Sequence, residues 1–248
     1  MEDFIIEYIE KLVLSDYLGV GIIGSYATSS HKKWSDVDLV CVVEEKRDNK
    51  VEIFKDHYFS VSYYTQDDFE TYIKRPSLQL NGLEALKQIK IIYDPKSLLK
   101  EIKTILSEFS PTSVDKERSL YLAKNEYVGY IEEAQKALQG YMDHHVGKML
   151  NGIYGLTYGM FQVIRLRDYL SITSDNDFYE CVMTHLDEKD PIKVLAPQAF
   201  GLESTQLEDQ VEAGLEIFMH VGNSLMTLFT EDEKEYGLKL IHEIIKEV

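Results

Sequence analysis

The chain has 248 residues, with 43 Asp or Glu against 26 Lys or Arg, so its formal net charge is −17 at pH 7. Hydrophobic residues make up 44% of the sequence, which is ordinary for a globular protein that buries a core. The negative charge argues against nucleic acid as a substrate, because a protein that neutralises phosphates needs a basic surface. It is compatible with a cationic small substrate, which an acidic cleft attracts.

Neither a membrane segment nor a signal peptide is expected. No apolar run reaches the roughly 18 residues that span a bilayer. The N-terminal stretch MEDFIIEYIEKLVL is acidic and amphipathic and lacks a basic region, so it is interpreted as a helix. Cys41 lies in an apolar stretch, far in sequence from Cys181, and is interpreted as a buried thiol. We therefore expect a cytoplasmic protein.

The first half of the chain alternates predicted strands and helices. Apolar residues at helical spacing predict a helix within residues 2–15. Short runs rich in apolar, aromatic and β-branched residues predict strands over residues 19–23, 36–43, 57–65 and 89–93. Helices are predicted from Asp67 and over 97–109, and a charged loop over 44–50.

The segment Ser110-Pro111-Thr112-Ser113 is the best candidate for a domain boundary. Beyond it, helical periodicity extends over about 114–139, 143–171, 175–186, 204–230 and 231–247, and Pro191 and Pro197 bracket a predicted connecting loop. The sequence thus predicts an α+β protein. Its first domain, residues 1–110, contains a mixed sheet with flanking helices, and its second, residues 111–248, is an all-helical bundle.

The most informative stretch runs from Gly21 to Glu44, GIIGSYATSSHKKWSDVDLVCVVE. A predicted strand ends in Gly24-Ser25, and the next opens with Asp36 and Asp38. Residues i and i+2 of a strand share a face, so both carboxylates project together. They do so beside a turn whose backbone can approach a phosphate closely. Magnesium takes oxygen ligands from one or two carboxylates and from phosphates, so the stretch predicts a Mg-nucleotide site.

The pattern G-S-Y-A, a short loop and then S-D-V-D-L resembles the nucleotidyltransferase superfamily of DNA polymerase β type. The layout of a small domain followed by a helical bundle resembles the antibiotic nucleotidyltransferases, in particular the kanamycin type, with the lincosamide type as a cousin. The resemblance is detailed over about residues 18–65 and only topological over 112–248. It implies a nucleotidyltransferase domain over 1–110 and a helical substrate-binding domain over 111–248.

The resemblance also implies roles for individual residues. Gly24 and Ser25 would hold the triphosphate, and Asp36 and Asp38 would bind Mg²⁺. Ser35 occupies the position where the family commonly has a small polar residue before the first carboxylate.

In the helical half, Asn125-Glu126-Tyr127-Val128-Gly129 resembles the segment that supplies a general-base glutamate in the kanamycin enzyme, which puts Glu126 forward. A solvated glutamate without a catalytic role is the other interpretation, and Glu132 and Glu133 are rivals nearby. The family's lysine beyond this segment is replaced by Tyr130, which leaves Lys124 or Lys148 as candidates for a phosphate contact.

The pattern departs from the superfamily at the third carboxylate, which normally lies on the strand predicted over 57–65. Alignment puts Ser60 at that position. Two interpretations follow: a carboxylate of the helical domain activates the acceptor, or the protein is a nucleotide-binding or regulatory module that no longer catalyses efficiently. Trp34, in the loop before the carboxylates, is open to two interpretations as well, stacking on a base or covering the core.

The function that the resemblance implies is Mg²⁺-dependent transfer of a nucleoside monophosphate from ATP, or another nucleoside triphosphate, to a hydroxyl of a small molecule. Pyrophosphate would be released. An aminoglycoside-like antibiotic is one such acceptor, and a cationic acceptor suits the charge of the chain. The implied partners are therefore a small molecule and, as in the kanamycin enzyme, a second copy of the chain. Fold-level likeness does not fix the acceptor.

Overall fold

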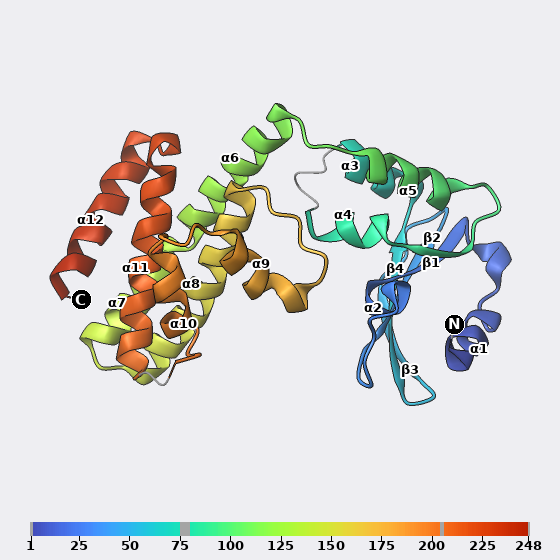
Figure 1. The fold of residues 1–248 in the computed structure, drawn as a ribbon, viewed down its shortest axis with the longest axis horizontal. Coiled ribbons are helices and arrows are strands. Elements are labelled where there is room, and N and C mark those ends of the chain that lie inside the picture. Colours follow the sequence, from blue (N-terminus) through green and yellow to red (C-terminus); the bar gives the residue numbers. More distant parts are fainter. Residues whose placement is uncertain (1, 75–79, 204–205, 248) are drawn as a thin grey trace. The chain divides into compact units, whose positions relative to one another are not determined.

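The computed structural model describes residues 2–74, 80–203 and 206–247 and forms two compact units. The first, here the sheet unit, comprises Met1–Asp115 with Ser171–Asp175 (Figure 1). The second, the helical unit, comprises Lys116–Leu170 and Asn176–Val248. No helix among the described residues is long and apolar enough to cross a membrane.

The sheet unit is built on a five-stranded mixed sheet, which agrees with the predicted α+β class. The order across the sheet is β3-β4-β2-β1-β5. Strands β2 and β4 run parallel, and the other neighbouring pairs are antiparallel. The strands are β1 (Gly19–Ile23), β2 (Val37–Val42), β3 (Lys50–Phe54), β4 (His57–Tyr64) and β5 (Lys90–Tyr93).

Alternation along the strands sends apolar side chains to both faces of the sheet. On one face, Leu39 and Phe59 pack with Ile5 and Tyr8 of helix α1 (Asp3–Glu10). On the other face, Val40 and Val42 pack beneath α3 (Gln66–Lys74), α4 (Leu80–Lys87) and α5 (Leu98–Glu108), which Figure 1 shows above the sheet. Two buried layers fix the sheet from both sides.

Helices α2 and α4 and strand β3 of the sheet unit are absent from the sequence-based prediction. Residues 24–28, predicted as a strand end at Gly24-Ser25 followed by a polar loop, form the short helix α2 (Gly24–Thr28). Strand β3 follows the predicted loop over 44–50, and it begins at Lys50, the last residue of that loop. Along β3 the apolar residues Val51 and Ile53 are the exposed ones, and their neighbours in the strand are half-buried. A strand that buries one face normally shows the opposite pattern. Lys55 and Asp56, both at positive φ, turn the chain from β3 into β4.

The helical unit contains seven α-helices among the described residues: α6 (Ser113–Gly129), α7 (Ile131–Met142), α8 (Val146–Arg167), α9 (Phe178–His185), α10 (Ile192–Ala199), α11 (Leu207–Leu225) and α12 (Glu231–Glu247). The single helix predicted over 114–139 is wrong, since the chain breaks at Tyr130 into α6 and α7. The loop predicted between Pro191 and Pro197 is also wrong, because α10 forms there. Pro191 precedes its first turn, where a missing N–H costs little.

The close approach of α7 and α8 depends on a glycine. A Cβ atom on Gly152 of α8 would lie 2.4 Å from the backbone nitrogen of Ala137 in α7 and 2.8 Å from its Cα. Backbone atoms cannot swing away as a flexible side chain can, so a larger residue must separate the two helices. Ala137 and Leu156 are buried in the same unit and would lose packing with that separation.

We expect Gly152→Ala to destabilise the helical unit by about 1–3 kcal/mol, because overpacking forces backbone shifts. The matched control is Gly237→Ala in α12, where nothing lies within 4 Å of the added Cβ. That substitution should be neutral or stabilising by up to about 1 kcal/mol, the helix propensity difference between Ala and Gly. Urea unfolding followed by circular dichroism measures both. Equal stability of the two variants would contradict the inferred contact.

Candidate functional site

Gly24 and Asp38 are in direct contact across the ends of β1 and β2. Gly24 follows β1 with φ +68°, a left-handed conformation that suits glycine. A Cβ atom at this position would lie 2.7 Å from Oδ2 of Asp38. The antiparallel pairing of β1 with β2, which sets Ile23 opposite Asp38, produces this approach. The glycine turn and the carboxylate predicted from the sequence are therefore neighbours in the structure.

Asp36 and Asp38 are carboxylates without protein partners. Within the described part of the chain, neither side chain has an ion pair or a side-chain hydrogen bond, whereas Asp68 of the same unit pairs with Lys46 and Thr65. Burial, and secondly the charge of Asp36, raise the pKa of Asp38 to about 6. A half-buried, uncompensated carboxylate is costly to the fold, which is typical of a group kept for binding.

Ser60 lies directly opposite Asp38 on the neighbouring parallel strand β4. The alignment that placed Ser60 at the third-carboxylate position thus corresponds to a side-by-side position in the sheet, on the face that carries Asp38. No cluster of three or more His, Cys, Asp or Glu side chains suited to a metal ion occurs in the described ranges. The described site therefore offers two carboxylates and, beside them, a hydroxyl.

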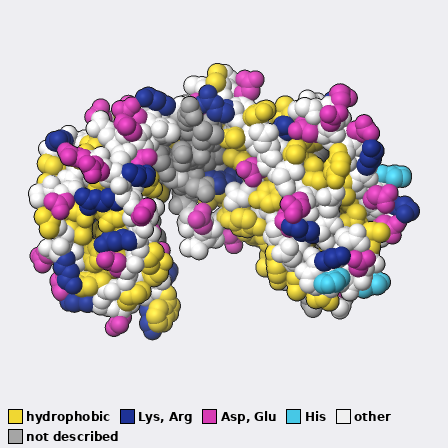
Figure 2. All heavy atoms as spheres, turned by 180° about the vertical axis from the view of Figure 1, so that it is seen from behind, with side chains coloured by type: hydrophobic (Ala, Val, Ile, Leu, Met, Phe, Trp, Pro, Cys, Tyr) yellow, Lys and Arg dark blue, Asp and Glu magenta, His cyan; other side chains and the backbone are white. Residues whose placement is uncertain are grey.

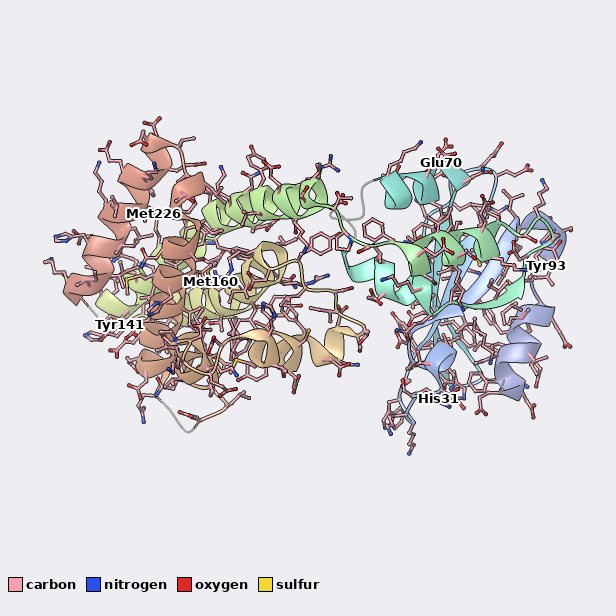
Figure 3. The ribbon with its side chains drawn as sticks, turned by 45° about the horizontal axis from the view of Figure 1, so that its top comes forward. His31, Glu70, Tyr93, Tyr141, Met160 and Met226 are labelled. Atoms are coloured by element: carbon pink, nitrogen blue, oxygen red, sulfur yellow. The ribbon has the colours of Figure 1, made fainter. Side chains whose placement is uncertain are left out.

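The loop between α2 and β2 is braced at both ends. The ring of His31 stacks on Tyr26 of α2 with 4.1 Å between centroids, and Figure 3 shows His31 beside this helix. The hydroxyl of Ser35 accepts a hydrogen bond from the backbone N–H of Lys32 at 2.8 Å. Its own backbone N–H donates to the carbonyl of Lys32 at 3.0 Å. Ser35 thus closes the turn that delivers Asp36, and its predicted contact with a nucleotide stays a prediction.

The same loop presents groups that our sequence analysis did not single out as functional. Lys32 and Lys33 are exposed between the glycine turn and the carboxylates, and they are the nearest cations to both in sequence. Their occurrence as two consecutive lysines inside the motif was the signal in the sequence that could have identified them as functional candidates. Trp34 is 87% exposed, with the Lys33 ammonium 4.9 Å from its ring. Trp34 therefore does not cover the core. Stacking on a base, its other predicted role, stays a prediction.

Glu126 lies on α6 in the helical unit and is exposed to solvent. Its rivals Glu132 and Glu133 both form ion pairs with Lys136, each at 2.9 Å. Glu126 has no such pair among the described residues. Its role stays a prediction.

The lysines proposed to contact phosphate are engaged inside the helical unit. Lys124 is buried and pairs with Glu233 at 2.8 Å, and this pair lowers the pKa of Glu233. Lys148 pairs with Asp143 at 2.8 Å. Lys124 is thereby committed to the packing of the helical unit, so Lys32 and Lys33 are the better candidates for a phosphate contact.

The residues at this site fit one magnesium ion. Asp36 and Asp38, two residues apart, supply hard oxygen donors. Burial and the neighbouring charge of Asp36 raise the pKa of Asp38. The missing Cβ of Gly24 leaves space directly at Asp38 Oδ2. Magnesium typically completes its octahedral shell with water and phosphate oxygens, so no further protein ligand is required for a single ion.

Comparison with protein families explains the motif. Residues 5–139 match the nucleotidyltransferase domain, which is more than half of the chain. The chain therefore belongs to this family, within the DNA polymerase β-like nucleotidyltransferase superfamily, as the Gly-Ser and Asp-x-Asp pattern predicted. The match extends past the predicted boundary at residue 110 into α7.

A solved structure shares the fold over nearly the whole chain. It is described as a nucleotidyltransferase-like protein from Exiguobacterium sibiricum 255-15, with 14% sequence identity and a TM-score of 0.53. The alignment covers 98% of this chain and 77% of that one. At such low identity the similarity shows the fold alone. A search of curated proteins finds no match.

The raised pKa of Asp38 predicts a pH-dependent cost to the fold. Because the native carboxyl binds its proton more tightly than the unfolded one, stability conferred by the neutral form is lost as pH rises from about 4 to above about 6. Asp38→Asn, which stays neutral, should be more stable than the wild type by about 1–2 kcal/mol at about pH 8, since water partly screens the group.

At about pH 4 the two proteins should differ little. Urea unfolding at both pH values in the presence of EDTA makes the comparison, with Asp48→Asn, which removes an exposed carboxylate of the same unit, as the control. A wild type as stable as Asp38→Asn at high pH would contradict the inferred desolvation.

Proposed function

We propose that this protein transfers a nucleoside monophosphate from Mg²⁺-bound ATP, or another nucleoside triphosphate, to a hydroxyl of a small molecule, with release of pyrophosphate. The observation that carries the proposal is the unpaired carboxylate of Asp38 against the side-chain-free backbone of Gly24. This arrangement brings a cation site and an open backbone turn together, as a Mg-nucleotide requires.

Each described residue has a definite task in this proposal. Gly24 and Ser25 hold the triphosphate through backbone that no side chain shields, and Lys32 and Lys33 supply positive charge to it. Asp36 and Asp38 hold the metal. When bound, Mg²⁺ supplies charge neutralisation at the phosphate oxygens. The chain's own contribution is positioning of the α-phosphorus for in-line attack, which is the main source of catalysis in phosphate transfer.

Glu126 is our candidate for the group that takes the proton of the acceptor hydroxyl. A general base contributes roughly 10²–10⁴-fold to a rate, so the loss of Glu126 should slow turnover without abolishing it.

The acceptor is proposed to be a small molecule, not a nucleic acid. The surface seen in Figure 2 intersperses acidic and basic side chains without a continuous basic band, consistent with the net charge of −17. A cationic acceptor, of which an aminoglycoside-like antibiotic is one kind, suits this charge. We also propose a cytoplasmic location and a homodimer. The two free cysteines, Cys41 and Cys181, suit a reducing compartment.

Replacing either metal-binding carboxylate tests the site. Asp36→Asn and Asp38→Asn should weaken Mg²⁺-dependent binding of a non-hydrolysable ATP analogue by about tenfold to a hundredfold, because each removes a charged oxygen ligand. Isothermal titration calorimetry with and without Mg²⁺ measures this. Asp48→Asn, an exposed carboxylate in the loop before β3, should bind like the wild type. If all three variants bind equally well, the site is wrongly placed.

A second function is favoured by Ser60. With a hydroxyl opposite Asp38, the site lacks the carboxylate that would hold a second ion, and two ions about 4 Å apart stabilise both the attacking and leaving oxygens. On this alternative the chain binds Mg-nucleotide and serves as a nucleotide-binding or regulatory module. Nucleotide binding without pyrophosphate release, across a broad set of hydroxylated acceptors, would favour it.

The number of bound ions tests the effect of Ser60. With the ATP analogue present, the wild type should bind about one Mn²⁺ and Ser60→Asp about two, because the new carboxylate faces Asp38 across the strand pair. Ser62→Asp is the matched control, since Ser62 lies opposite Val40 on the same face. It should still bind about one. Electron paramagnetic resonance counts the free Mn²⁺. A wild type that binds two ions would show that the missing carboxylate is replaced elsewhere.

A further inference from the structure

The sheet carries exposed apolar side chains on the face of the carboxylates. Val51 and Ile53 of β3 are 57% and 70% exposed, and Tyr58 of β4 is 45% exposed. Val51 pairs with Ser60, and Ile53 pairs with Tyr58. Because paired residues share a face, these three side chains, here the apolar strip, lie on the same face as Ser60 and Asp38. Edge strands usually carry charge on such positions.

The order of the strands gives the site a direction. Gly24, at the end of β1, lies on one side of Asp38 of β2, and Ser60 of β4 lies on the other. The apolar strip follows beyond Ser60. Strands are about 4.8 Å apart, so Val51 is about 10 Å from Asp38 across the sheet. The hairpin β3–β4 and the loop before β2 occupy the same end of the sheet (Figure 1).

Gly24, Asp38, Ser60 and the apolar strip form a row across the sheet. The geometry of in-line displacement determines at which end of this row the leaving group lies and from which end the acceptor enters. The leaving pyrophosphate remains at the glycine turn, on the β1 side, and the attacking oxygen must approach the α-phosphorus from the opposite side. The acceptor hydroxyl therefore enters from the side of Ser60, and the rest of the acceptor extends toward Val51 and Ile53. The strip lies where the body of an acceptor about 10 Å long would rest.

We propose that the apolar strip is the acceptor subsite and that the acceptor carries its reactive hydroxyl on an apolar or aromatic body, which narrows the proposed acceptor, cationic or not, to one less polar than an aminoglycoside. This inference rests on the proposed function. In the reaction, the hydroxyl oxygen forms a bond to the α-phosphorus while the bond from that phosphorus to the pyrophosphate oxygen breaks. The hydroxyl proton leaves to a base or to water. No oxidant or further reactant is needed.

The size of the strip favours a small molecule over a second copy of the chain. Stable protein interfaces bury at least about 1,200 Å² in total. Three partly exposed side chains offer a small part of that area, which matches what a ligand of one or two rings covers. Continuity with Ser60 and the carboxylates further restricts the occupant to a molecule that reacts there.

A homologous series of alcohols provides the probe. We would titrate 1-butanol, 1-hexanol and 1-octanol into protein saturated with Mg²⁺ and a non-hydrolysable ATP analogue, observing Val and Ile methyl groups by NMR. Methyl signals of Val51 and Ile53 should shift, and the dissociation constant should fall about threefold to fourfold for each added CH₂ group. In Ile53→Ser this dependence on chain length should be weaker. In Val13→Ser, which changes a 61% exposed valine elsewhere in the same unit, it should be unchanged.

Mn²⁺ in place of Mg²⁺ reports orientation. The carbinol protons of the bound alcohol should relax faster than its terminal methyl protons, because the hydroxyl end lies nearer the carboxylates. Three results would each overturn the proposal. They are equal methyl chemical-shift changes at Val13 and Val51, an alcohol affinity that does not depend on chain length, and faster relaxation of the terminal methyl protons than of the carbinol protons. If the alcohols bind the strip but Mn²⁺-nucleotide binds neither wild type nor Asp38→Asn, the proposed function fails first and this subsite fails with it.

Discussion

The contact between the backbone of Gly24 and the carboxylate of Asp38 organises the sheet unit. It requires a residue without a side chain at positive φ, placed at the end of one strand, and an acid two residues into the next. Neither partner alone defines a site, since a glycine turn is common and a solvated aspartate on the surface does not destabilise the fold. Together they create an uncompensated charge that is partly buried, with open backbone beside it. Apolar layers pack against β1 and β2 on both faces of the sheet and offset part of this cost.

The mixed sheet turns that contact into a row of chemically distinct positions. The order β3-β4-β2-β1-β5 sets an open glycine turn, two carboxylates, a serine hydroxyl and an apolar strip side by side. The parallel pairing of β2 with β4 is the decisive feature, because it brings the beginnings of both strands to one end of the sheet. The transfer that we propose uses such a row, in which the leaving group, the metal and the acceptor follow one another along a line. The chain belongs to this family, and the geometry accounts for why the motif takes its form.

Several polar and charged groups of the helical unit serve the fold. Lys124 is held by Glu233, and Arg167 forms two hydrogen bonds with Asp168, at 2.8 and 2.7 Å. The side chain of His145 caps α8 by accepting from the backbone of Lys148. Each is a polar group satisfied by a protein partner, which is the rule for buried or half-buried charge. Asp38 is half-buried and has no ion pair or side-chain hydrogen bond among the described residues, and burial raises its pKa.

The sequence by itself determined the α+β class, the strand Gly19–Ile23 residue for residue, and the proximity of Gly24 to Asp38. Short-range signals were sufficient there, because a strand of period two fixes which side chains share a face. The tertiary structure alone decided the rest. Strand β3 has exposed Val51 and Ile53, so no buried pattern marked it, and only its pairing with β4 reveals it. Helix α10 forms across a segment bracketed by prolines because packing outweighs local propensity. The position of Ser60 beside Asp38 arises from strand register, which depends on contacts between residues distant in the chain.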